Sequence, residues 1–385
     1  MTYNIRISNI TSVSIASIAF SLLTILSIHD YMTETLLAEN FSGLQDFSYY
    51  RSILLGIISF SLIYPILRYK LPNPISDSSS FLTVGDDYYF DDDTNAYNSI
   101  DSPRKLAILG VLSLSALFIF IFIYSPRLFN YLCLENNPIE LFSAAFWFLA
   151  FGLFIGTFVL FRKLPGHIRN IYLTISFSLA IVSFLAGIEE ISWTQSFFHF
   201  KSPAFFRTNI QGEVNLHNFS THRLENMFYF STFLFLVLIP FINDKIHIYK
   251  KYPVLFFFLP SRFIVLMTAI AFSYNFSTWN IIFIQLSFFI TTIILIHYFF
   301  EFHQGKDTRI FLGTLFVCFI LNQIIFLKYG HNSIRCFDVK EYKEFFIALS
   351  FLVYALEVMT RSKHTVPKIK YVSNNNLKSR FAKKR

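Results

Sequence analysis

Two adjacent carboxylates, Glu189 and Glu190, follow a long apolar run and are the side chains best placed for acid–base chemistry. Two carboxylates at the carboxyl end of a helix repel each other and oppose the helix dipole, so another interaction has to hold them there. The polar stretch that follows contains His217 and His222. Because a carboxylate beside an imidazole suffices for general acid–base work, we expect these four residues to be the catalytic groups. The alternative is an acidic pair solvated at the membrane surface.

Hydrogen-bonding side chains fill the segment between these acids and the next apolar run. If residues 214–226 are helical, several of them share one helical face that leads into the membrane. That face would carry Asn215, Asn218, His222 and Glu225. The residues expected to contact a substrate in this region are Trp193, Gln195, Gln211, Glu213, Asn215 and Asn218. The alternative is a network of interfacial hydrogen bonds.

A divalent metal ion is a further possibility, with Glu189 or Glu190 and the two histidines as ligands. His217 and His222 are five residues apart, whereas a spacing of three or four places two ligands on one helical face. The spacing therefore does not favour a metal site. The cofactor is left open, and no residue is assigned as a metal ligand.

Arg262 follows Pro260 in the apolar stretch 253–273. An arginine buried in a membrane costs several kcal/mol unless it is paired. We expect the helix to be broken at Pro260 and Arg262 to bind an acidic partner or a phosphate of the substrate. In the alternative interpretation the helix starts after Arg262, whose side chain extends to the membrane surface.

The composition excludes an ordinary soluble domain. Of 385 residues, 54% are hydrophobic and 15% are charged, whereas soluble domains have about 25% charged residues. A membrane-spanning helix needs about 20 apolar residues. Such segments occur near 8–28, 51–68, 105–125, 140–161, 170–188, 225–242, 253–273, 278–300, 309–327 and 343–360. The sequence therefore predicts an all-α polytopic transmembrane bundle of about ten spans.

The basic residues predict the orientation of this bundle. Lys and Arg concentrate in alternate loops and in the C-terminal tail, which indicates the cytosolic side. With ten spans, both termini are cytosolic and the loop 189–224 is exoplasmic. The net charge of +8 lies largely beside apolar runs, so we expect membrane lipids rather than nucleic acid as partners. The expected location is a bacterial plasma membrane.

The expected parts of the chain differ in composition. Residues 1–70 form a two-helix piece, 71–104 an acidic polar loop, 105–360 the main eight-helix body, and 361–385 a basic tail. Cys133 and Cys336 share the predicted exoplasmic side, but free thiols are the favoured interpretation. The sequence does not indicate the oligomeric state.

Two segments resemble those of a family of bacterial multi-pass membrane proteins. Residues 187–195 read GIEEISWTQ and residues 209–218 read NIQGEVNLHN; the family carries EEISWGQR and NxQGExNLHN segments. The resemblance covers roughly residues 130–225, and it departs from the family at Thr194 and Ser196, where Gly and Arg are usual. It implies a membrane location and the place of a site, not its chemistry.

Three functions remain open at this point. The first is a membrane-embedded hydrolase or transferase that acts on a lipid or lipid-linked substrate at the exoplasmic surface. The second is a transporter or proton-coupled permease, suggested by Arg262 and by Asn322 and Gln323 within an apolar span. The third is a scaffold without catalysis, whose polar loop binds another protein.

Overall fold

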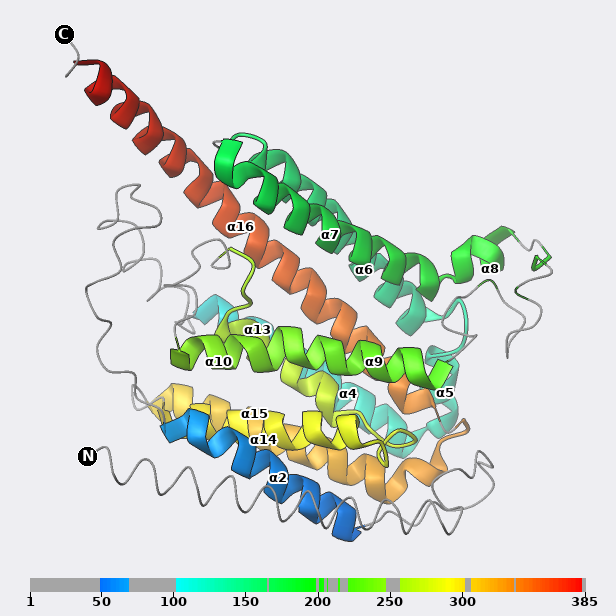
Figure 1. Cartoon of the computed structure of the whole chain (residues 1–385). Coiled ribbons are helices and arrows are strands. Elements are labelled where there is room, and N and C mark those ends of the chain that lie inside the picture. Colours follow the sequence, from blue (N-terminus) through cyan, green and yellow to red (C-terminus); the bar gives the residue numbers. More distant parts are fainter. Residues whose placement is uncertain are drawn as a thin grey trace.

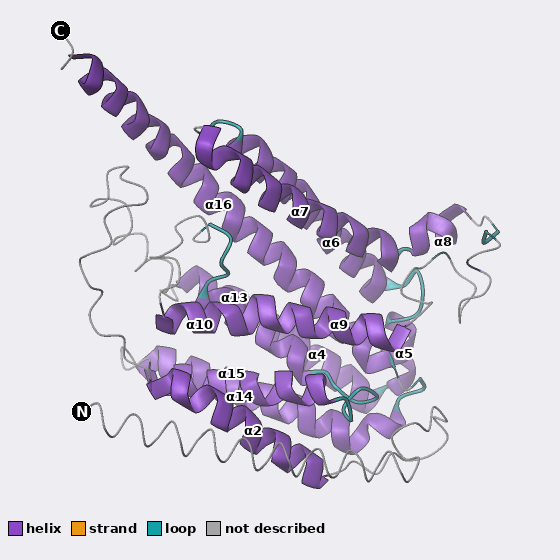
Figure 2. Ribbon diagram, in the orientation of Figure 1, coloured by secondary structure: helices purple, strands orange, loops and turns teal. Residues whose placement is uncertain are grey.

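The computed structural model describes residues 49–68, 102–164, 166–198, 201–203, 206, 214, 221–246, 257–301, 306–335 and 337–382. All regular structure in these ranges is helical (Figures 1 and 2). The elements are α2 (Tyr49–Arg68), α4 (Ser102–Tyr124), α5 (Pro126–Leu132), α6 (Pro138–Phe161), α7 (Gly166–Glu190), η1 (Ser192–Thr194), α8 (Gln195–Phe198), α9 (Thr221–Phe233), η4 (Leu234–Leu238), α10 (Ile239–Ile246), α13 (Arg262–Ala269), η5 (Ile270–Ser273), α14 (Ile282–Glu301), α15 (Lys306–Tyr329), η6 (Gly330–Asn332) and α16 (Asp338–Ala382).

Among the described residues, seven helical segments are long and apolar enough to cross a membrane. They are Ser102–Tyr124, Pro138–Phe161, Arg169–Glu190, Leu224–Lys245, Ile282–Glu301, Thr308–Asn332 and Asp338–Lys363. The chain is therefore a multi-pass α-helical membrane protein, as its composition predicted. The predicted span 51–68 coincides with α2, which is not among the seven. The predicted span 8–28 and most of the loop 71–104 lie outside the described residues.

The predicted span at 253–273 is not one continuous membrane-crossing helix. Residues 257–260 are not helical, and the helical part is only Arg262–Ser273, formed by α13 and η5. Twelve residues reach about 18 Å at ~1.5 Å per residue, short of the ~30 Å hydrocarbon core. Pro260 is the physical reason, because proline lacks an amide hydrogen and disfavours helical geometry in the residue before it. The described helix starts at Arg262, which fits both a break at this proline and a helix that begins beside Arg262.

Side chains of α16 satisfy the non-helical backbone that precedes α13. The Tyr354 hydroxyl donates to the carbonyl of Phe258 at 2.6 Å, and Arg361 Nη1 donates to the carbonyl of Leu259 at 2.8 Å. Irregular backbone is tolerated at membrane depth only where protein or water supplies such partners. The short helix therefore depends on α16 for its place in the bundle.

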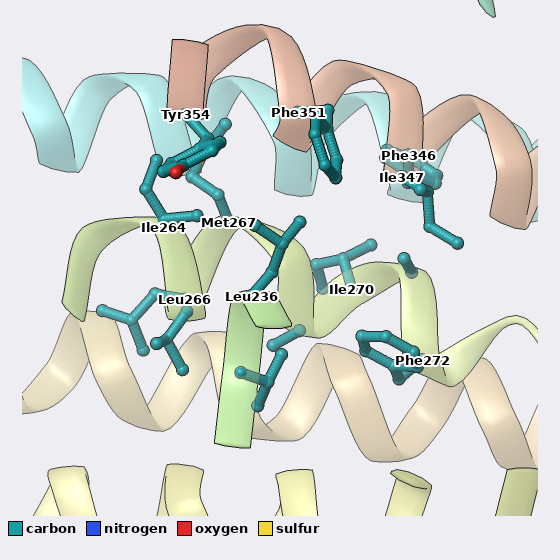
Figure 3. Packing of buried hydrophobic residues seen from close by; sticks show 14 of the residues in the cluster. Leu236, Ile264, Leu266, Met267, Ile270, Phe272, Phe346, Ile347, Phe351 and Tyr354 are labelled. Carbon is teal, nitrogen blue, oxygen red and sulfur yellow. The ribbon is translucent and has the colours of Figure 1, made fainter. Parts of the chain in front are cut away.

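The apolar core surrounds this short helix. α13 packs against α16, η4, α10 and α4, while α6 packs against α7 and α16. Figure 3 shows Ile264 and Met267 of α13 facing Tyr354 of α16, with Leu236 of η4 close by. All four side chains are nearly or fully buried. A helix that is apolar on every side is typical of a bundle interior, which is where α13 lies.

Most of the described carboxylates gather at one end of the bundle and most of the described basic side chains at the other. Glu225 of α9 pairs with Lys340 of α16 at one end, and Arg262 of α13 pairs with Glu301 of α14 at the other. We call the first the acidic end; it holds Glu135, Glu140, Glu189, Glu190, Glu225, Asp338, Glu341 and Glu344. We call the second the basic end; it holds Arg104, Lys105, Arg162, Lys163, Arg169, Lys245, Arg262, Arg309, Arg361 and Lys363. Figure 1 shows α5 and α8 at the acidic end, and α10 and the first turns of α15 at the opposite one.

Candidate functional site

The first turns of α16 carry the centre of the candidate site. Asp338 and Glu341 lie in the first turn, where their negative charge suits the helix dipole. Lys340, Lys343 and Glu344 follow them, so that α16 presents carboxylates and amines to several neighbouring helices. The contacts of these side chains decide what the acidic end can do.

Asn130 of α5 and Arg335 of the loop before α16 hold the side chain of Asp338. Asn130 Nδ2 donates to both oxygens of the Asp338 carboxylate, at 2.9 and 3.1 Å, and Arg335 Nε donates to Oδ1 at 2.8 Å. Burial disfavours the charged form of Arg335, but the bond to Asp338 and its charge outweigh burial and raise the pKa of the guanidinium. This network is structural, since it anchors the start of α16.

Lys343 is fully buried in the bundle. Its Nζ donates to Asn275 Oδ1 at 2.7 Å and lies 4.4 Å from the centroid of the Tyr229 ring. Asn275 is itself held by Gln323, whose Oε1 accepts from Asn275 Nδ2 at 2.8 Å. A buried ammonium inside a membrane bundle is rare and marks a functional site by default.

Glu344 lies beside this lysine and is bound from another helix. The hydroxyl of Tyr229 on α9 donates a hydrogen bond to its carboxylate. One turn earlier, Lys340 Nζ contacts Glu225 at 2.6 Å, and both side chains are largely buried. Pairs of this kind bring α9 and α16 together at a fixed register.

Glu190 reaches the same cluster from the end of α7. Its carboxylate interacts with the charges of Glu344, Glu341 and Glu140, and it accepts a hydrogen bond from Trp147 of α6. The residue is half-buried. Three helices thus converge here with carboxylates that repel one another, an arrangement that bundle stability alone does not favour.

Glu189 points in a different direction. The indole Nε1 of Trp193 donates to Glu189 Oε1 at 2.6 Å, whereas Glu190 faces α6 and α16. The two acids of the pair therefore have different partners.

The turn that carries Trp193 is strained. Ser192 and Trp193 have φ angles of 46° and 51°, which lie in the left-handed region. This conformation costs of order 1–3 kcal/mol for a residue other than glycine, and it clusters at functional sites. Two such residues in succession, next to the acidic cluster, favour a functional role for this turn.

Gln195 connects the same turn to the loop that follows through two side-chain hydrogen bonds. Its Nε2 donates to Ser202 Oγ at 2.8 Å, and its Oε1 accepts from the amide of Val214 at 2.8 Å. Both ends of its side-chain amide are therefore engaged within the protein. Its predicted substrate contact remains a prediction.

Several predicted site residues cannot be placed in this cluster. Gln211, Glu213, Asn215, His217 and Asn218 lie outside the described residues. α9 begins at Thr221, so the predicted helical face includes His222 and Glu225 in its described part. The side chain of His222 is also outside the description. The role of the two histidines stays a prediction.

Arg262 lies at the basic end and not beside Glu189 and Glu190. Its Nε contacts Asp244 Oδ2 at 2.5 Å, and its Nη2 contacts Glu301 Oε1 at 3.4 Å. The expected acidic partner is confirmed. The predicted set of site residues is accordingly split between the two ends of the bundle.

Tyr229, Trp147 and Lys343 were missed by the sequence-based prediction. Tyr229 and Trp147 each sit in an apolar run, where aromatic residues are expected for packing alone. Lys343 could have been predicted as a site residue, because a lysine at the point where α16 enters the membrane needs a hydrogen-bonding or charged partner.

No metal site is found in the described ranges: they contain no group of three His, Cys, Asp or Glu side chains that could hold an ion. Comparison with known proteins also provides no assignment. No protein-family model, no curated protein and no solved structure matches this chain. Function has to be inferred from the geometry of the acidic end.

Proposed function

We propose that this protein is a membrane-embedded hydrolase or transferase that acts on a lipid or lipid-linked substrate at the acidic end of the bundle. One observation supports this proposal above the others. The carboxylates of Glu190 and Glu344 come from different helices and their charges interact, while Trp147 contacts the first and Tyr229 the second. Pairs of carboxylates in unlike environments are the usual equipment for transferring a proton to and from a reacting group.

The roles follow from what each carboxylate touches. Glu190 ends α7, next to the turn that carries Trp193, so it is assigned as the group that exchanges the proton with the attacking water or hydroxyl. Glu344 is held by Tyr229 and flanked by Lys343, so it fixes the charge and geometry of the cluster. Trp193, held against Glu189, supplies a wall for the substrate.

The surroundings favour a substrate with a lipid anchor. The acidic cluster lies at the ends of membrane-spanning helices, at the level of lipid headgroups. Large apolar side chains near it, such as Phe142 on α6 and Leu185 on α7, are exposed on the bundle surface. In a bilayer these faces contact acyl chains, so a lipid-linked substrate reaches Glu190 by lateral diffusion.

The orientation is part of this proposal. The basic end is assigned to the cytosol and the acidic end to the exoplasm, because Lys and Arg flank cytosolic ends of spans. The seven segments, a first span, an α2 that also crosses the bilayer, and the broken segment 257–281, which leads from Arg262 at the basic end to the start of α14 at the acidic end, make ten crossings. An even number of crossings gives two cytosolic termini in a bacterial plasma membrane. The family resemblance of residues 187–195 agrees with that location.

The amides of Asn322 and Gln323 do not strengthen the transporter alternative. Asn322 Nδ2 donates to Ser115 Oγ at 2.8 Å and to Ser273 Oγ at 3.2 Å. Gln323 Nε2 donates to the carbonyl of Asn275 at 2.7 Å. Both amides hold η5 and the turn after it, which is a structural role.

The test uses the purified full-length chain in lipid nanodiscs, incubated with isotope-labelled glycerophospholipids and polyprenyl-phosphate-linked sugars. Products are followed by mass spectrometry. Glu190→Gln should lower the rate by roughly 10²–10⁴-fold, the usual contribution of general acid–base catalysis. The matched control is Glu135→Gln, an exposed carboxylate at the same end. Full activity in both Glu189→Gln and Glu190→Gln would refute the proposal, as would the absence of any product from the wild type.

A further inference from the structure

Exposed basic side chains surround the basic end of the bundle. They come from the end of α6 and the start of α7, from the start of α15, and from α16 where its apolar segment ends. The exposed members are Arg162, Lys163, Arg169, Arg309 and Lys363. We call them the basic collar. They lie where the spanning helices leave the membrane, at the depth of the headgroups.

α16 continues beyond this collar. Its apolar segment ends at Lys363, but the helix runs on to Ala382. Residues 364–382, which we call the C-terminal arm, extend about 28 Å at ~1.5 Å per residue. Figure 1 shows the arm projecting past the ends of the neighbouring α6 and α7.

The arm carries one sign of charge. No acidic residue follows Glu357 in the sequence. The basic residues of the arm are Lys368, Lys370, Lys378 and Arg380, and Lys383, Lys384 and Arg385 follow it. Each basic residue close to an anionic leaflet strengthens attachment by on the order of fivefold. Charge complementarity therefore selects anionic lipid as the partner.

If the arm stayed straight and pointed away from the membrane, most of its basic residues would lie too far from the lipid headgroups to be attracted to them. Attraction to a charged surface fades beyond about 8–10 Å at physiological salt, whereas the arm is longer than that distance. Pro367 lies at the base of the arm, within the helix. Proline removes the backbone hydrogen bond to the residue four positions earlier, here Lys363, and thereby kinks helices or lets them bend.

We propose that the C-terminal arm bends at Pro367 and lies on the anionic headgroups of the leaflet at the basic end, beside the basic collar. Binding of the arm then depends on the content of anionic lipid in the leaflet at the end opposite the acidic cluster. This inference does not depend on the proposed enzymatic activity.

The experiment places a fluorescent amino acid at Ser379 of the full-length protein, reconstituted in nanodiscs with a quencher on the lipid headgroups. One set contains phosphatidylcholine alone, and the other also contains phosphatidylglycerol. Quenching should be strong with phosphatidylglycerol and should be reversed by high salt. The same probe at Thr360, an exposed position inside the spanning segment, is the positional control.

Two variants separate the elements of the proposal. The quadruple variant K368Q/K370Q/K378Q/R380Q should lower the ratio of bound to free arm by roughly 600-fold, whereas K368R/K370R/K378R should behave like the wild type. P367A should keep the arm straight and weaken quenching at Ser379. Quenching that is equal in both lipids, or unchanged in the quadruple variant, overturns the proposal; wild-type quenching in P367A overturns the bend.

Discussion

The hydroxyl of Tyr229 on α9 donates a hydrogen bond to the carboxylate of Glu344 on α16, and the two residues are separated by 115 positions in the sequence. The ring of the same tyrosine lies against the buried amine of Lys343. One aromatic side chain thus contacts a carboxylate and an amine that are neighbours in the sequence. Helix capping alone does not explain this double contact at the acidic end.

Replacing Tyr229 with phenylalanine should destabilise the protein by about 1–3 kcal/mol, because a carboxylate then loses a donor inside the bundle. The free energy of unfolding, or the midpoint of thermal unfolding in detergent, measures the effect. Tyr131→Phe is the matched control, since Tyr131 is 56% exposed at the same end. Equal midpoints for the two variants would contradict a structural role of the Tyr229–Glu344 bond.

Arg262→Met should be more costly, at about 3–5 kcal/mol, because it leaves Asp244 and Glu301 without the guanidinium that pairs with them. The Asp244→Asn change should cost much less in the Arg262→Met background than alone. A double-mutant cycle on unfolding free energies measures this coupling. Additive effects would show that Arg262 and Asp244 do not act as a unit. Arg309→Met changes an exposed residue at the same end and should leave the unfolding free energy nearly unchanged.

Gly330 tolerates no side chain, because a Cβ built there would lie 2.2 Å from Cδ2 of Phe276. Gly330→Ala should therefore destabilise the protein by roughly 1–3 kcal/mol through overpacking. Adding Phe276→Ala should recover part of this loss. At Gly110 nothing lies within 4 Å of the added Cβ, so Gly110→Ala should stabilise α4 by about 0.5–1 kcal/mol. Thermal unfolding of all three variants tests the contrast.

Cys133 should react slowly with alkylating reagents. Its thiol is free and buried, and burial, followed by the negative charges of Asp338 and Glu341, raises its pKa well above the ordinary value. Because the thiolate is the reactive form, a raised pKa leaves less of it at a given pH. The rate of Cys133 alkylation, measured by mass spectrometry at several alkaline pH values, should be lower than the rate for glutathione. Asp338→Asn should speed it, and an unchanged rate would contradict the electrostatic contribution.

The helical membrane fold was predictable because apolar runs of about 20 residues leave the backbone no other option in lipid. The stretch 253–273 misled the prediction, since its apolar composition resembles that of a span while Pro260 prevents the helix from starting earlier. What satisfies its backbone is Tyr354 and Arg361, far along the chain. Local composition does not reveal such distant partners.

The candidate site was predictable in part. Glu189 and Glu190 stood out because adjacent carboxylates at a helix end oppose local electrostatics. The bond between Glu189 and Trp193 did not follow from helical spacing, because α7 ends at Glu190 and Trp193 lies in a left-handed turn. Tyr229 and Lys343 were not predictable as a pair, because their contact joins helices that are distant in sequence and neither residue type demands the other.

The dependence of the short helix on α16 also sets an order of events during biosynthesis. The carbonyls of Phe258 and Leu259 receive their donors from residues 96 and 102 positions later in the chain. When residues 257–273 leave the ribosome, those donors have not yet been synthesised, and a segment of this length cannot settle alone in the bilayer. The segment is therefore lodged in its final position only after α16 has entered the membrane. A chain truncated before Tyr354 should accumulate as an assembly intermediate with this segment exposed to the insertion machinery.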